Sequence, residues 1–138
     1  MSPAEARAFL AAGTKTGKLA TVRSDGRPHV APIWFVLDDD AVVFTTGADT
    51  VKGRAMQRDP RVSLCADDES PPFSYVRVDG EVTISDDLDE MLTWTTRIAA
   101  RYMGEDLAES YGKRNAVKGE LLVRLRPAKI VGEKNVSD

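Results

Sequence analysis

Three hydroxyl side chains, a lysine, an arginine and two glycines lie close together in residues 45–54, TTGADTVKGR. Hydroxyl groups and cations donate hydrogen bonds to phosphate oxygens, and glycine lets backbone amides approach a ligand. A helix that begins near Thr50 would point its unpaired amides the same way. The segment therefore predicts a phosphate seat made of Thr45, Thr46, Thr50, Lys52 and Arg54. The alternative is that Asp49 or Thr50 caps a helix whose basic residues are solvated.

A second feature lies upstream, in the segment HVAPIWF, residues 29–35. Pro32 has no amide hydrogen to donate, so it favours a sheet edge, a bulge or an opening in the sheet. Beside such an opening, Ile33 and Trp34 would give a flat apolar wall to a fused-ring ligand. The alternative is that Trp34 belongs to the core and Pro32 marks an edge. If the two segments lie on neighbouring strands, a ring platform adjoins the phosphate seat.

The chain offers few groups for nucleophilic or acid–base catalysis. A hydrolytic nucleophile needs an adjacent base, and the single histidine, His29, stands in a predicted strand away from any serine motif. The acidic runs 38–40 and 67–69 fall in a predicted turn and at a strand end, where solvation is their common role. One cysteine, Cys65, and one histidine cannot build an internal disulfide or an ordinary structural zinc site. We therefore expect a bound cofactor to carry the reactive atom, and no metal.

The elements that position these residues are short helices and alternating strands. Helical signals cover residues 3–12, where Ser2 and Glu5 form a capping box, and then 50–59, 87–103 and 106–115. Strand signals cover residues 19–24, 29–38, 41–46, 61–66, 73–85 and 120–132. The first three strands are joined by short turns and predict an antiparallel meander. The pattern as a whole predicts a mainly β (α+β) fold with a closed or nearly closed antiparallel barrel.

Length and charge limit the class of protein. The chain has 138 residues, so we expect one domain spanning residues 1–138. A formal net charge of -3 and a pI near 5.2 argue against broad nucleic-acid binding, which needs a cationic face. No apolar run approaches the length of about 18 residues that a membrane helix needs. With no basic-then-apolar leader at the N-terminus, we expect a cytoplasmic protein without a membrane partner.

Residues 19–64, LATVRSDGRPHVAPIWFVLDDDAVVFTTGADTVKGRAMQRDPRVSL, closely resemble the split β-barrel flavin and deazaflavin oxidoreductases. This superfamily is named for pyridoxamine 5'-phosphate oxidase, and the likeness is to the group that uses the deazaflavin coenzyme F420. It continues through PPFSYVRVDGEVTIS, TRIAARYMG and GELLVRLRPAKI. The resemblance implies an FMN-binding-type split barrel of six or seven antiparallel strands with short peripheral helices. It also implies a homodimer with two interface cofactor sites, and hydride transfer to a small organic substrate with an activated double bond.

By position, the resemblance assigns roles to the residues already singled out. Lys52 matches the lysine that contacts the cofactor phosphate, with Thr45, Thr46 and Thr50 beside it, and Pro32, Ile33 and Trp34 match the strand against the ring system. Arg54, Arg58 and Arg61 offer cations for the oligoglutamate tail of coenzyme F420, or are surface charge. Tyr75 and Arg77 are expected to approach from the other protomer.

The resemblance also has departures and open points. The C-terminal segment LRPAKIVGEKNVSD has no histidine, so oxidation of vitamin B6 is not expected. FMN remains an alternative cofactor, because the same lysine and threonines can hold its phosphate. A protein that binds a flavin or a tetrapyrrole without turnover is the second functional class. A role for His29 in catalysis stays open.

Overall fold

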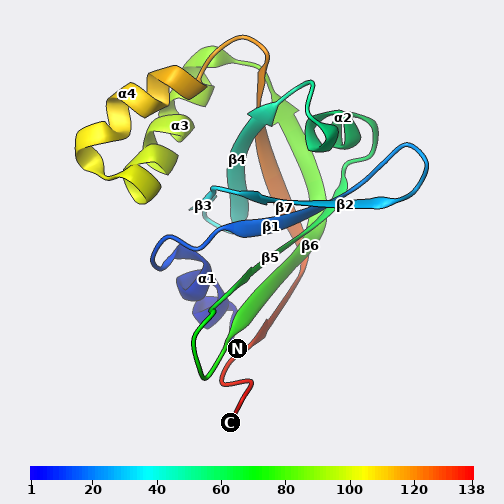
Figure 1. Cartoon of the computed structure of the whole chain (residues 1–138), viewed down its shortest axis with the longest axis vertical. Helices are drawn as coiled ribbons and strands as arrows, with labels where there is room; N and C mark the ends of the chain where they lie inside the picture. The colour runs from blue at the N-terminus through cyan, green and yellow to red at the C-terminus, as the bar shows by residue number, and fades with distance from the viewer.

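The computed structural model describes residues 1–138 and consists of seven strands and four helices (Figure 1). The strands are β1 (Gly17–Val22), β2 (Pro28–Ile33), β3 (Val36–Asp38), β4 (Ala41–Gly47), β5 (Arg61–Asp67), β6 (Tyr75–Ser85) and β7 (Glu120–Glu133). The helices are α1 (Pro3–Ala11), α2 (Val51–Arg58), α3 (Leu88–Met103) and α4 (Glu105–Asn115). The predicted helices and most of the predicted strands are confirmed, with ends that differ by one or two residues. None of the four helices combines the length and apolar character that a membrane crossing requires.

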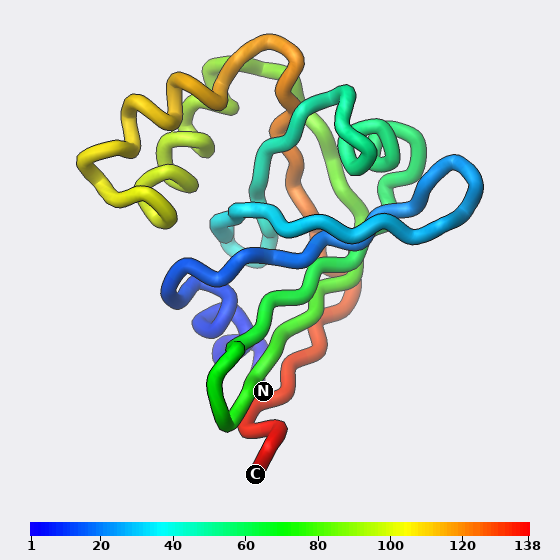
Figure 2. Tube along the Cα trace, viewed as in Figure 1, coloured from blue at the N-terminus to red at the C-terminus, as the bar shows by residue number.

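All seven strands belong to one antiparallel sheet in the order β2-β1-β5-β6-β7-β4-β3. Figure 2 shows the trace of β1 and β2 running across the long strands β6 and β7, so the sheet curves strongly. Its two outer strands, β2 and β3, are joined by just two residues, Trp34 and Phe35. The chain itself therefore connects the two edges of the sheet, and the predicted split β-barrel is confirmed.

The predicted strand over residues 29–38 is wrong in one respect, because it divides into β2 and β3 after Ile33. The backbone of Phe35 turns from the sheet to α3: its amide donates to the Tyr102 hydroxyl at 3.2 Å, and its carbonyl accepts from Arg101 at 2.7 Å. The predicted meander is wrong for the same reason. β2 pairs with β1 alone, whereas β4 pairs with β3 and β7.

The core fills the inside of the barrel and is formed by the alternating inward side chains of the strands. Phe35, Phe44, Leu19, Leu64 and Leu125 are fully buried in a cluster of 17 residues. A smaller cluster of Val43, Met91, Trp94 and Leu122 packs α3 against β4 and β7. Helices α3 and α4 pack on each other beside the barrel (Figure 1). This packing directs one side of α3 toward the end of β2.

Candidate functional site

A cavity of about 380 Å³ lies where β4 ends, α2 begins and β7 starts. Figure 1 shows these three places together at one end of the molecule. The volume is in the range of sites that hold small ligands. Seven of the ten predicted site residues line the cavity: Pro32, Ile33, Trp34, Thr45, Thr46, Thr50 and Lys52. Gly47, Ile98, Asn115 and Glu120 complete the lining.

Helix α2 begins at this cavity because Thr50 caps it. The Thr50 hydroxyl accepts a hydrogen bond from the Gly53 amide at 3.0 Å and donates to the Gly47 carbonyl at 2.8 Å. The Thr46 hydroxyl lies 3.2 Å from the Thr50 hydroxyl oxygen. Capping is therefore the role of Thr50 in this structure. This agrees with the alternative interpretation of the sequence, in which Thr50 caps a helix. Thr45 keeps a hydroxyl free of hydrogen bonds inside the chain.

Gly53 lets α2 approach the end of β4 closely. A Cβ atom at this position would collide with the Gly47 carbonyl and come within 2.9 Å of the Thr50 hydroxyl oxygen. The amides of Val51 and Lys52, in the first turn of α2, have no acceptor within the chain. Two free amides therefore begin a helix whose dipole favours a negative charge at this end.

Two charged side chains line the cavity, Lys52 from α2 and Glu120 from β7. Lys52 takes part in none of the ion pairs of the chain. Burial raises the pKa of Glu120, and the charge of Lys52 partly opposes that rise. The sequence interpretation missed Glu120, which reads as the polar first residue of a strand. Its place in the cavity follows from the pairing of β7 with β4, where Glu120 lies opposite Gly47.

Trp34 forms the apolar side of the cavity, with 40% of its surface exposed. The Tyr102 ring stacks on it, with 4.9 Å between ring centroids and 5° between planes. The Tyr102 hydroxyl donates to the Lys15 carbonyl at 2.7 Å, and burial raises the pKa of this phenol. The sequence analysis predicted a helix over residues 87–103 and assigned Tyr102 no role in the site. Its contact with Trp34 depends on the break between β2 and β3, which no local pattern reveals.

Arg101 fixes the backbone around this wall. Its guanidinium donates to the carbonyls of Phe35 and Leu10, each at 2.7 Å, and of Gly13 at 2.9 Å. It also lies over the Phe35 ring, 4.7 Å from the centroid. Desolvation by burial lowers the pKa of Arg101. The residue thus joins α3, the end of α1 and the turn after Trp34, so the wall of the cavity is held from behind.

The model of one protein family, described as pyridoxamine 5'-phosphate oxidase, matches residues 2–132. The chain belongs to this family. No curated protein matches the sequence.

Solved structures of the same architecture agree with the family. A conserved hypothetical protein from Mycobacterium tuberculosis superposes with a TM-score of 0.85 at 24% identity, covering 99% of this chain and 87% of that one. An F420 reductase superposes with a TM-score of 0.70 at 27% identity, covering 89% and 94%. An FAD-binding protein from Mesorhizobium loti gives 0.69 at 22% identity, covering 96% and 92%. The matches below 25% identity show the fold alone.

Three residues predicted for the site lie outside the cavity of this family member. Arg54 is exposed on α2 and does not line the cavity. Tyr75 and Arg77 stand near the beginning of β6, at the opposite end of the molecule from α2 (Figure 1). Arg77 is paired there with Asp79 at 3.1 Å. Within one protomer these two residues cannot contact a ligand beside Lys52.

His29 also lies outside the cavity, on β2. Its Nδ1 atom is buried without a hydrogen-bond partner, and so is the hydroxyl of Thr21, its neighbour on β1. Cys65 is half-buried on the other side of β5 from Leu64. Neither His29 nor Cys65 lines the cavity that contains Lys52.

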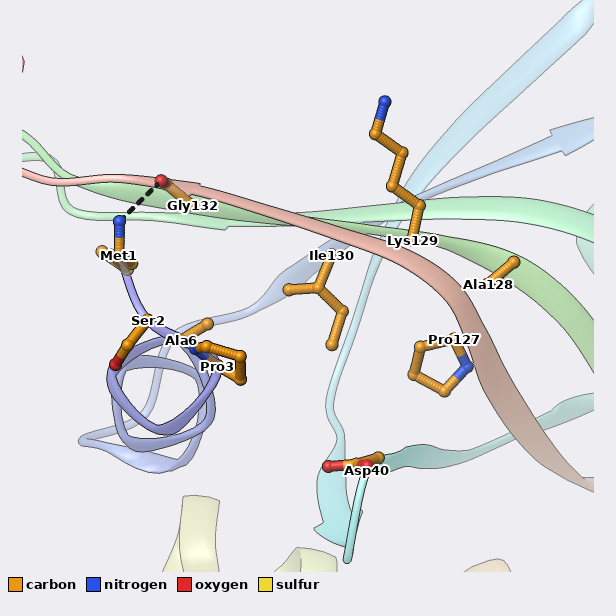
Figure 3. Close-up of a pocket in the computed structure, with 10 residues that line it drawn as sticks. All are labelled: Met1, Ser2, Pro3, Ala6, Asp40, Pro127, Ala128, Lys129, Ile130 and Gly132. Atoms are coloured by element: carbon orange, nitrogen blue, oxygen red, sulfur yellow. Dashed lines mark hydrogen bonds between the residues drawn. The ribbon is translucent and has the colours of Figure 1, made fainter.

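A second cavity, of about 340 Å³, lies between α1 and the outer half of β7. Figure 3 shows Pro127 and Ile130 pointing into it, whereas Lys129 extends from the other side of the strand. Asp40 is paired with Arg7 at 3.0 Å, and the N-terminal amine donates to the Gly132 carbonyl at 3.3 Å. The charged groups that line this second cavity are therefore bonded within the chain or directed away from it, whereas Lys52 in the first cavity has no partner.

Proposed function

We propose that this protein is a coenzyme F420-dependent oxidoreductase that binds its cofactor in the cavity at the start of α2. The observation that carries the proposal is an unpaired cation beside two free helix amides, facing a wall made by Trp34. A cofactor with an anionic tail and a planar ring system needs a positively charged surface and an apolar wall side by side. Family membership and similarity to an F420 reductase support the choice of a deazaflavin.

In this proposal the residues of the chain bind the cofactor and orient it. Lys52 and the amides of Val51 and Lys52 hold the cofactor phosphate, with the Thr45 hydroxyl available as a further donor. Pro32, Ile33 and Trp34 lie against the ring system, and Tyr102 keeps the Trp34 ring in place from behind. When bound, the deazaflavin supplies the carbon, C5, that carries the hydride to an acceptor with an activated double bond. The cavity needs no protein nucleophile for that reaction.

Two further parts of the proposal concern the ends of the cofactor. Of the three arginines suggested for the oligoglutamate tail, Arg58 donates to the Val22 carbonyl at 2.6 Å and Arg61 pairs with Asp59 at 2.7 Å. Arg54 alone among them has no partner in the chain, so we assign the tail to Arg54. Tyr75 and Arg77 reach a cofactor only from a second protomer, which makes the proposed homodimer necessary for their roles.

FMN is the second candidate, because a phosphate seat of one lysine and helix amides does not depend on the ring of the ligand. Titrating the purified protein with FMN and with coenzyme F420 under identical conditions separates the two. We expect tighter binding of coenzyme F420. Equal or tighter binding of FMN would contradict the choice of cofactor, and absence of binding by both would remove the proposed function.

Turnover is tested with reduced coenzyme F420 and enone, quinone or tetrapyrrole acceptors. We expect the reduced coenzyme to be reoxidised, with a change in its absorbance, in the presence of at least one acceptor. Lys52→Ala provides the control for dependence on the cavity. Tight binding with unchanged absorbance for every acceptor would instead indicate a protein that binds its ligand without turnover.

A further inference from the structure

Glu120 is a carboxylate in a cavity that we expect to bind an anion. It is the first residue of β7, lies opposite Gly47 on β4, and lines the same cavity as Lys52. Its side chain donates or accepts no hydrogen bond and forms no ion pair, although the residue is half-buried. A carboxylate with no partner beside a phosphate site costs binding energy for any anion, so its presence calls for a physical reason.

The charges on the cavity wall nearly cancel. Lys52 contributes one positive charge and Glu120 one negative charge, while the other lining residues, including Asn115 on α4 and Ile98 on α3, are uncharged. Asp49 and Arg54 lie nearby on and before α2, but both are exposed and screened by water and salt. The helix amides and Lys52 attract any anion, and Glu120 subtracts from that attraction in proportion to the anion's charge.

That proportionality distinguishes two kinds of phosphate. A phosphomonoester, as in FMN, carries about -1.5 to -2 at pH 7 because its second pKa is near 6. A phosphodiester carries one negative charge, and the phosphate of coenzyme F420 is of this kind. Repulsion by Glu120 therefore weakens a monoester more than a diester, whereas the neutral ring contacts are the same for both.

We propose that Glu120 is a specificity-determining residue that shifts the preference of the cavity away from a dianionic phosphomonoester and toward a singly charged phosphodiester. The inference rests on the proposed function, which places the phosphate beside Lys52, and it adds the reason for the choice of cofactor. The direction of the Glu120 pKa, raised by burial, agrees with a carboxylate that is poorly solvated and senses an added negative charge.

The test compares ligands that differ in charge alone. Wild-type protein and Glu120→Gln are titrated with FMN and with the monomethyl ester of FMN, in which the phosphate is a diester. Glutamine keeps the size of the side chain and removes its charge, and it exchanges one acceptor oxygen for an amide donor. We expect Glu120→Gln to tighten FMN about tenfold and the methyl ester about threefold, so the ratio of the affinity for FMN to the affinity for the ester rises about threefold.

A matched control removes the same charge from a glutamate away from the cavity and from β6. Glu105→Gln lies at the start of α4, is exposed, and does not line the cavity. We expect this variant to change the affinities for FMN and its ester by less than about twofold, as a screened distant charge does. The ratio of the two affinities is also insensitive to partial unfolding, because both ligands bind the same folded fraction.

Two outcomes overturn the inference. One is an equal change of both affinities in Glu120→Gln, and the other is weaker binding of FMN by Glu120→Gln, which would show that the charge of Glu120 does not repel the phosphate. A parallel titration with coenzyme F420 keeps the two proposals apart. If wild-type protein fails to bind coenzyme F420 but the FMN ratio shifts as expected, the proposed function fails and the charge selectivity stands.

Discussion

Lys52 and Arg77 are both cations at an end of the barrel, and they differ in what surrounds them. Lys52 has no ion-pair partner and lies beside free helix amides. Arg77 forms an ion pair with Asp79 at 3.1 Å, and Asp79 also accepts a hydrogen bond from Ser63 at 2.7 Å. The first charge is available to an incoming anion, whereas the second is already engaged by a network on β5 and β6.

This difference shows that a cation's residue type says less about binding than its local partners do. An anion that binds Lys52 displaces no ion-pair partner, but an anion that binds Arg77 must compete with Asp79. The end of the barrel with α2 is therefore the one prepared for a charged ligand. The β5–β6 end contributes only if a second protomer brings it there.

The largest expected effect comes from disturbing the start of α2. Gly53→Val places a branched side chain against the Gly47 carbonyl and the Thr50 hydroxyl, so α2 must move away from β4. We expect the free energy of unfolding to fall by about 3 kcal/mol, and cofactor affinity to fall with it. Urea unfolding measures the first quantity and titration the second.

Arg54→Val is the control for the unfolding measurement on Gly53→Val, because it adds the same side chain one position later, where the residue is exposed. It is not a control for affinity, since Arg54 is assigned to the cofactor tail. The helix propensity of valine alone costs about 0.5 kcal/mol or less. If Gly53→Val is no more destabilising than this control, the close contact between α2 and β4 does not determine the geometry of the site.

Removing the free cation is expected to have the next largest effect. Lys52→Ala should weaken cofactor binding by about 1 to 3 kcal/mol, the size of a lost charge-assisted hydrogen bond. Because Lys52 has no partner in the chain, we expect the unfolding free energy to stay nearly constant. Lys118→Ala, an exposed lysine outside the cavity, serves as the control. Unchanged affinity in Lys52→Ala would remove the phosphate assignment.

The sequence predicted much of this, for reasons that are local. Alternating burial over Val62, Leu64 and Ala66 marks a strand, and the serine before Pro3 marks a helix start. Pro32 correctly indicated a sheet edge, because β2 is an outer strand that pairs with β1 alone. The order of the strands was not predictable, because it depends on how the barrel closes through Trp34 and Phe35.

Roles that arise from contacts between distant elements also escaped prediction. Tyr102 lies 67 positions from Phe35, whose amide donates to its hydroxyl, and the sequence predicted only the helix to which Tyr102 belongs. Glu120 belongs to the cavity through its pairing with Gly47. Thr50, in contrast, was interpreted correctly as a possible cap, since capping is decided within a few residues of sequence.

Asp79 and Glu120, at the two ends of the barrel, should make the free energy of unfolding depend on pH in opposite directions. The Ser63 hydroxyl, with Arg77, lowers the pKa of Asp79, so its stabilising contribution is present above its ordinary pKa and lost as the pH falls through the depressed value. Burial raises the pKa of Glu120, so its contribution is present below its ordinary pKa and lost as the pH rises through the raised value.

Urea unfolding near pH 7 and near pH 4 tests this contrast. Asp79→Asn should be less stable than wild type at the higher pH, with a smaller difference at the lower pH. Glu120→Gln should be more stable than wild type at the higher pH and similar to it at the lower pH. The same sign for both variants at the higher pH would contradict the distinction between a paired and an unpaired carboxylate.

The smallest effect is expected for Arg77→Ala, which we predict changes cofactor affinity by less than about threefold, even in a dimer. Half-exposed and held by Asp79, Arg77 must give up one anion to gain another, so its net contribution is small.

Asp79→Asn sharpens the comparison, because it frees Arg77 without removing it. If Arg77 reaches the partner's cofactor, this variant should bind the cofactor up to about threefold more tightly. A loss in Arg77→Ala as large as that in Lys52→Ala would break the comparison, since the assembled protein would then draw Arg77 away from Asp79 and into the site.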